Sequence, residues 1–148
     1  MTHLIHRRDT LHAGLAWGLA MALPSARACE FITSNLTVVH PWVRATAPGA
    51  TSASVCMGFK DVVISDRLID ARTPVAERID MGGTGDETGI DFQIDAGEES
   101  ALTEAGQHLK LVGLAFPLGL GTSYPLRLLF QKAGPIDALL TVDYARFR

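Results

Sequence analysis

Apolar and polar residues alternate in short runs along most of the chain, and glycine and proline separate these runs. Alternation with a period of two is typical of a β-strand that has one buried face. The first such run, residues 36–40, is rich in β-branched side chains and is expected to stop at Pro41. Further strands are predicted at 55–59, 67–69, 78–81, 92–95, 108–114, 124–130 and 136–144.

The spacing of these runs indicates the fold class. Turn sequences such as Pro48-Gly49, Gly82-Gly83 and Ala133-Gly134-Pro135 lie between them, and no segment after residue 28 has the periodicity of an amphipathic helix. Many short strands with turns between them favour an antiparallel sandwich or barrel. The chain has no internal repeat or linker, so we predict one all-β domain.

The first 28 residues have the pattern of a secretory signal peptide. Arg7 and Arg8 precede an apolar run at 11–23, and Ala26 and Ala28 form a small-x-small cleavage site. The apolar run is too short for a stable membrane span. We therefore predict a signal peptide at 1–28 and a domain of about 120 residues at 29–148, which suffices for one core. The paired arginines also fit a twin-arginine signal, so both export routes stay open.

Cys29 directly follows the predicted cleavage site, which raises lipid attachment as an alternative. A lipidation site usually has leucine three residues before the cysteine, whereas this chain has Ala26, and Arg27 adds a charge. We therefore expect a soluble periplasmic protein, which we predict to be a monomer.

Charge and motifs exclude several classes of function. The chain has a formal net charge of −3, and the leader removes three arginines but only one aspartate, so the exported part is more acidic. Binding to nucleic acid requires basic surface, and no nucleic-acid partner is expected. No later apolar segment is long enough to span a bilayer. The chain also lacks hydrolase, zinc-protease, phosphate-loop and dinucleotide motifs, so we predict that it is not an enzyme.

The two cysteines, Cys29 and Cys56, both remain after cleavage of the leader. In an oxidising compartment a disulfide between them is the favoured interpretation. A role for a cysteine as a thiolate metal ligand is the alternative.

Several segments resemble the PCu(A)C family of periplasmic copper chaperones. The similarity runs from about Val38 to Val142 and rests on these segments: Pro41-Trp42-Val43-Arg44-Ala45-Thr46-Ala47-Pro48-Gly49-Ala50, Asp66-Arg67-Leu68-Ile69-Asp70-Ala71, His108-Leu109-Lys110-Leu111-Val112-Gly113-Leu114 and Tyr124-Pro125-Leu126-Arg127-Leu128-Leu129-Phe130. The resemblance implies a cupredoxin-like, antiparallel Greek-key β-sandwich. It also implies that the protein delivers copper to the copper sites of respiratory oxidases.

The copper motif of that family, H-x10-M-x21-H-x-M, is only partly present. The resemblance places His108 at the second histidine, but Lys110 stands at the following methionine. Counting back from His108, the first methionine position falls on Asp86. The preceding loop is shorter than that of the family, so the first histidine position aligns with Asp80, next to Met81. Imidazole and thioether groups suit Cu(I), whereas carboxylates prefer harder ions. The resemblance therefore implies a reduced Cu(I) site with His108, Met81 and Asp80 as candidate ligands.

Alternation within the predicted strand 108–114 places His108 and Lys110 on one face and Leu109 on the other. An ammonium group beside a cation site repels the ion by roughly 1 kcal/mol or more. His108 as an ordinary surface residue and Met81 as core packing are the alternative interpretations. Two functions follow: a copper chaperone with a degenerate site, or a metal-free periplasmic interaction or assembly module.

Overall fold

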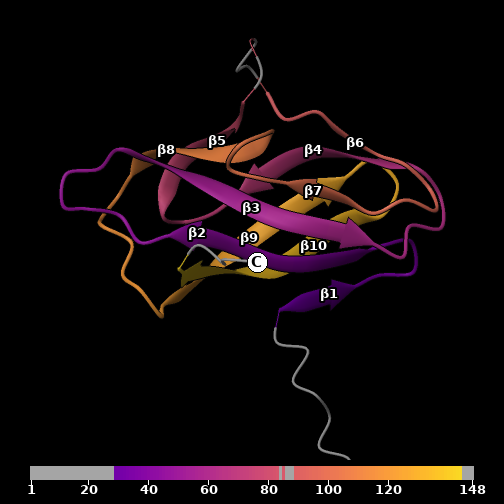
Figure 1. Ribbon diagram of the computed structural model, residues 1–148, viewed down its shortest axis with the longest axis horizontal. Helices are drawn as coiled ribbons and strands as arrows, with labels where there is room; N and C mark the ends of the chain where they lie inside the picture. Colours follow the sequence, from indigo (N-terminus) through magenta and orange to yellow (C-terminus); the bar gives the residue numbers. More distant parts are fainter. Residues whose placement is uncertain (1–28, 84, 86–88, 145–148) are drawn as a thin grey trace, which may run out of the picture.

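The computed structural model describes residues 29–83, 85 and 89–144, so the predicted leader at 1–28 and Asp86 lie outside the described residues. The described part is built from strands (Figure 1). No helix in it has the length and apolar character needed to cross a membrane. The strands are β1 (Glu30–Ile32), β2 (Thr37–Arg44), β3 (Ser52–Lys60), β4 (Asp66–Arg72), β5 (Ala76–Gly82), β6 (Phe92–Ile94), β7 (Ser100–Leu102), β8 (His108–Leu114), β9 (Ser123–Phe130) and β10 (Gly134–Asp143).

The strands form one sheet in the order β5-β8-β3-β2-β10-β9-β4-β6, with β1 added to β2 and β7 added to β3. The sheet curls so that its two halves face each other (Figure 1). Aromatic contacts join the halves: the ring of Phe59 on β3 lies 5.7 Å from that of Phe92 on β6 and 6.0 Å from that of Phe130 on β9. The predicted all-β, cupredoxin-like sandwich is confirmed, with one difference. The pair that joins the halves, β2 with β10, is parallel.

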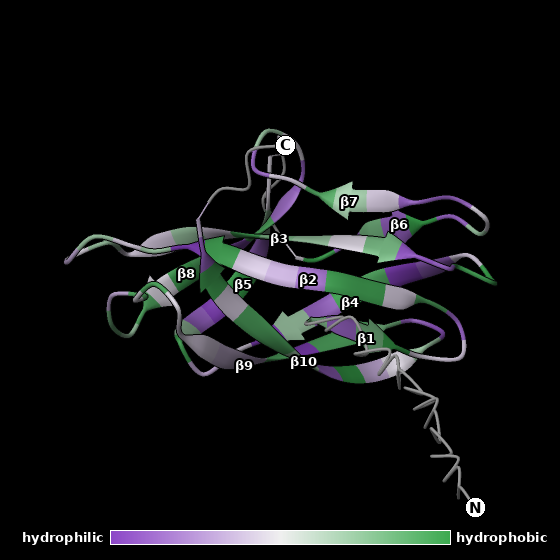
Figure 2. Cartoon of the chain, turned by 60° about the horizontal axis from the view of Figure 1, so that its bottom comes forward, coloured by the Kyte–Doolittle hydropathy of each residue, from purple (hydrophilic) through white to green (hydrophobic). Residues whose placement is uncertain are grey.

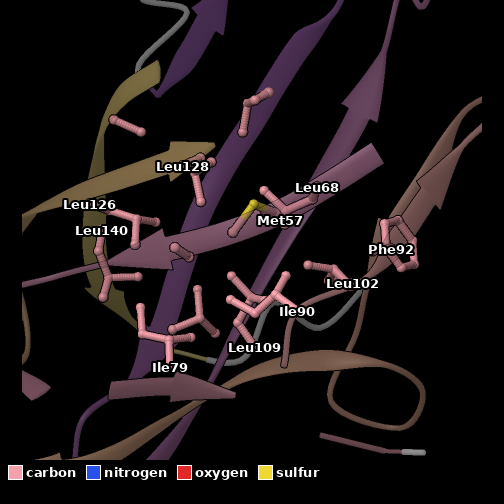
Figure 3. Packing of buried hydrophobic residues seen from close by; sticks show 14 of the residues in the cluster. Met57, Leu68, Ile79, Ile90, Phe92, Leu102, Leu109, Leu126, Leu128 and Leu140 are labelled. Carbon is pink, nitrogen blue, oxygen red and sulfur yellow. The ribbon is translucent and has the colours of Figure 1, made fainter. Parts of the chain in front are cut away.

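The core lies between the two halves and follows from the alternation in the sequence. Green and purple segments alternate along several strands in Figure 2, as expected when one face of each strand is buried. Met57, Leu68, Leu109 and Leu128 come from four different strands and pack together in the core (Figure 3). The burial of this apolar surface is the main force that stabilises the sandwich.

The first long strand differs from its prediction. β2 does not stop at Pro41 but continues to Arg44. Its register with β3 shifts between Val39 and Trp42, and His40 within this bulge has a φ of +44°. Because Pro41 lies in the bulge, its missing N–H group removes no hydrogen bond from the ladder.

Candidate functional site

The outer face of β5 and β8 brings together the residues that were predicted from the copper motif. Asp80 pairs with Lys110, and Gly82 pairs with His108, on these two antiparallel strands. Residues two apart on a strand point to the same face, so Asp80, His108 and Lys110 lie on one surface. The predicted orientation of His108 and Lys110, away from Leu109, agrees with the full burial of that leucine.

The imidazole of His108 is oriented by the backbone. Its Nδ1 lies 3.1 Å from the carbonyl oxygen of Gly106. When Nδ1 carries the proton and donates it to this carbonyl, Nε2 keeps a lone pair. Metal-binding histidines are commonly held this way, with the second ring nitrogen bonded to a carbonyl or carboxylate.

Two glycines at the end of β5 provide the space for this arrangement. A Cβ atom at Gly82 would lie 2.3 Å from Nε2 of His108, so the ring lies directly over the backbone of this glycine. Gly83 has a φ of +81°, and a Cβ atom there would lie 2.0 Å from the carbonyl oxygen of Gly106. Only glycine fits both the close approach and the left-handed backbone of Gly83.

Asp80 already has a cationic partner. Its Oδ2 accepts a hydrogen bond of 2.9 Å from Nε of Arg78, and its cross-strand neighbour is Lys110. A copper ion near this carboxylate would therefore meet two other cations, each of which repels it. Asp80 is correctly placed on the surface of the site, but its charge is balanced within the protein.

Met81 lies on the opposite face of β5 from Asp80. Its side chain is 3 % exposed and belongs to the hydrophobic core. The prediction of Met81 as a ligand beside His108 is therefore wrong in this fold, because adjacent residues of a strand point to opposite faces. The thioether fills core space instead.

The predicted disulfide between Cys29 and Cys56 is absent, and both thiols are free. β3 and β1 both pair with the same residues of β2, so they lie on its two opposite edges. Cys56 is on β3, while the Sγ of Cys29 lies 3.7 Å from the hydroxyl of Thr141 on β10. Two strand spacings give a separation of about 10 Å, which exceeds the roughly 7 Å that a disulfide can bridge.

Cys56 lies on the outer face of β3 beneath an ion pair. Arg44 donates two hydrogen bonds to the carboxylate of Glu104, from Nε and from Nη2, the latter at 2.8 Å. Burial raises the pKa of the Cys56 thiol to about 11, and the negative charge of Glu104 adds to this effect. The hydrogen bond from Arg44 lowers the pKa of Glu104. The sequence analysis missed the pairing of Arg44 with Glu104, because it has no local sequence signal.

Within the described part of the chain, no three histidine, cysteine, aspartate or glutamate side chains gather in a way that would hold a metal ion. His108 is therefore the one predicted ligand that has both the right face and a suitable orientation. A four-ligand copper site of the kind implied by the motif is not assembled from these residues.

The family of the chain follows from comparison with known sequences. A family model for LpqE-like lipoproteins matches residues 36–142, which include every strand from β2 to β9 and all of β10 except its last residue. The chain belongs to the LpqE-like family. No curated protein matches this LpqE-like chain.

Solved structures with the same fold include PCuAC domains. The copper-bound PCuAC domain from PmoF2 is 23 % identical, with a TM-score of 0.70 over 77 % of this chain and 97 % of that domain. The apo PCuAC domain from PmoF1 gives the same identity and TM-score, over 77 % of this chain and 98 % of that domain. Cu(I)-bound DR1885 from Deinococcus radiodurans is 20 % identical, with a TM-score of 0.60 over 84 % of this chain and 86 % of that chain.

Together with the family match, these likenesses agree with the predicted recognition of a PCuAC-type chain, and they show that it has the fold of those domains. What this LpqE-like chain binds is argued from its own residues.

Proposed function

We propose that this LpqE-like protein is an exported, non-catalytic copper-handling domain. It carries Cu(I) through His108 and passes the ion to the copper sites of respiratory oxidases. The observation that carries this proposal is the arrangement of the imidazole: Nδ1 lies against the Gly106 carbonyl, and Nε2 lies over Gly82, at the motif position for a copper ligand. The copper-bound states of the PmoF2 domain and of DR1885 support it by analogy.

We expect the outer face of β5 and β8 to hold copper only weakly. Arg78 and Lys110 both lie beside Asp80, and each adds repulsion toward an incoming cation. Weak binding is compatible with a protein that must release its ion to another site.

A metal-free interaction or assembly module is the second candidate function. It is favoured by the burial of Met81 in the core and by the Arg78–Asp80 ion pair, which occupies the carboxylate at the first motif position. In this role the sandwich binds a periplasmic protein, and His108 has no metal to bind.

Substitution of His108 with alanine is expected to weaken Cu(I) binding at least about tenfold, because its imidazole nitrogen is the one ligand of the motif that this chain keeps. The measurement is a Cu(I) titration of residues 29–148, which contain every strand of the fold, against a competing chelator. Gly82→Ala is also expected to weaken binding, because its methyl group displaces Nε2 while the imidazole is retained.

His40→Ala is the matched control. His40 forms an ion pair of 3.5 Å with Asp143, on the side of β2 that faces β1 and β10, and its loss should leave the Cu(I) affinity unchanged. If neither the parent protein nor any variant competes with the chelator, copper handling is rejected and the metal-free module stands. Equal effects of His40→Ala and His108→Ala would also contradict the assigned site.

Export is expected to leave Cys29 as the first residue of a soluble periplasmic protein. The family is described as lipoproteins, whereas Arg27 and Ala26 disfavour lipid attachment in this chain. Mass spectrometry of the protein from a periplasmic extract should give the unmodified mass of residues 29–148. A mass increased by a diacylglycerol group, in a membrane fraction, would contradict soluble export.

A further inference from the structure

An insertion in the sheet lies opposite Cys56. Val55 on β3 pairs with Leu109 on β8, and Met57 pairs with Leu102 on β7, both antiparallel. Cys56 alone therefore faces the whole stretch from 103 to 108. The segment 103–107, called the 103–107 loop below, leaves the sheet and returns, closed by a hydrogen bond of 2.8 Å from the Thr103 amide to the Gln107 carbonyl.

The 103–107 loop is fastened across the outer face of the sheet. Its residue Glu104 accepts two hydrogen bonds from Arg44 on β2. Cys56 points to this outer face, since Val55 and Met57 on either side of it belong to the core. Outer-face residues are normally accessible, yet Cys56 is only 2 % exposed. The loop and its ion pair lie beside the thiol and contribute to its burial, together with Trp42, its direct cross-strand neighbour on β2.

The same loop determines where the imidazole of His108 points. The β3–β8 ladder ends at the pair of Val55 with Leu109, and extending it by one residue would set His108 opposite Cys56, on the same face. The ring nevertheless lies over Gly82 on β5, with Nδ1 against the carbonyl of Gly106 in the 103–107 loop. One loop thus covers the thiol and holds the imidazole away from it.

Cys56 also has no structural role that would require a thiol. No hydrogen bond reaches its sulfur within residues 29–83, 85 and 89–144. Its side chain is buried, but it lies outside the cluster of apolar residues packed between the two halves of the sheet. The Cys56 thiol and the His108 imidazole lie on the same face of the sheet, beside a loop that the Arg44–Glu104 ion pair holds in place. A thiolate and an imidazole together suit Cu(I), and the motif residues alone do not provide this pair of ligands.

We propose that Cys56 and His108 form a two-ligand site for Cu(I), and that the 103–107 loop with the Arg44–Glu104 pair is the latch that closes it. When the loop lifts, Gly106 leaves Nδ1, and the ring turns from β5 toward β3. Cu(I) then bonds to the sulfur of Cys56 and to one ring nitrogen of His108. The thiol proton is released to solvent, so that a neutral thiol and Cu⁺ give a neutral Cu–thiolate and H⁺. This inference rests on the proposed function, because it supplies the second ligand beside His108.

The latch is tested by the reactivity of the thiol, without any metal. In a Cys29→Ser background, Glu104→Gln is expected to raise the rate at which Cys56 reacts with an aromatic disulfide reagent by at least about tenfold, since the covering ion pair is lost. Asp91→Asn is the matched control, because Arg67 and Asp91 form a similarly exposed pair with two hydrogen bonds far from Cys56. An equal rate in the two variants would overturn the latch.

The site is tested by Cu(I) titration against a chelator in the same Cys29→Ser background. Cys56→Ser is expected to lower the affinity as strongly as His108→Ala does, and Glu104→Gln is expected to raise it. X-ray absorption of the copper complex should show one sulfur and one nitrogen neighbour. Binding that depends on His108 but not on Cys56 would overturn this inference and leave the proposed function intact. Absence of binding in all variants would overturn both.

Discussion

Replacement of Asp66 with alanine is expected to lower the free energy of unfolding by about 3–5 kcal/mol. The carboxylate is 2 % exposed. Its Oδ1 accepts hydrogen bonds of 2.8 Å from the backbone amides of Arg67 and Lys132. Its Oδ2 accepts bonds of 2.8 Å from the amide of Ala133 and 3.0 Å from the side chain of Asn35. Truncation leaves these donors without acceptors where water has little access.

Urea unfolding at neutral pH measures this loss. Asp66→Asn keeps one carbonyl oxygen as an acceptor, so its destabilisation should lie between those of the parent and of Asp66→Ala. A loss below about 1 kcal/mol for Asp66→Ala would show that water replaces the carboxylate, and that the network does not hold this end of the sandwich together.

The carboxylate of Asp66 also affects how the free energy of unfolding depends on pH. Burial tends to raise the pKa of Asp66, but the hydrogen bonds from Lys132, Arg67, Ala133 and Asn35 outweigh it and lower the pKa. A lowered pKa in the folded state means that the carboxylate stabilises the fold above its unfolded pKa of about 3.9. This contribution is lost as the pH falls through the folded pKa. Asp66→Asn should therefore lose less stability than the parent on acidification.

Phe59→Ala is expected to cost about 3–5 kcal/mol of unfolding free energy. Its side chain is 1 % exposed, and its ring contacts Phe92 and Phe130 in the facing half of the sheet. The substitution therefore removes apolar contacts between the two layers and leaves a cavity between them. Thermal and urea unfolding of the variant measure the effect.

Phe116→Ala is the matched control for this substitution. Phe116 also contacts another ring, that of Tyr124 at 5.7 Å, but its side chain is 45 % exposed. Its loss should cost no more than about 1 kcal/mol. Similar losses for the two phenylalanines would contradict the placement of Phe59 as the contact between the layers.

Much of the fold was predictable because most strands bury one face. The run from His108 to Leu114 alternates clearly, and β8 begins and ends at the predicted residues. The same alternation placed His108 and Lys110 on the outer face. β1 and β7 were missed because their three residues do not alternate between apolar and polar, whereas the equally short β6 does, with Gln93 between Phe92 and Ile94.

The candidate site was predicted less completely. Met81 was expected as a ligand, although Ile79 and Met81 alternate with Asp80 and so already belonged on the inner face of the predicted strand. The error came from treating proximity in sequence as proximity in space. The Arg44–Glu104 pair joins residues that are far apart in sequence, and no local pattern reveals it. The disulfide failed because the curled sheet places β2 between the two cysteines.

The parallel pairing of β2 with β10 has a consequence for how the chain folds. It joins Trp42 to Thr141, so nearly the whole described chain lies between two strands that must meet. Closing such a long loop costs conformational entropy before native contacts form that can offset it. Pairing between residues this distant in sequence therefore slows folding. The pairing of β2 with β10 cannot form until β10 is available, so in a chain that crosses a membrane amino terminus first the two halves of the sandwich are joined only after the other described strands have crossed.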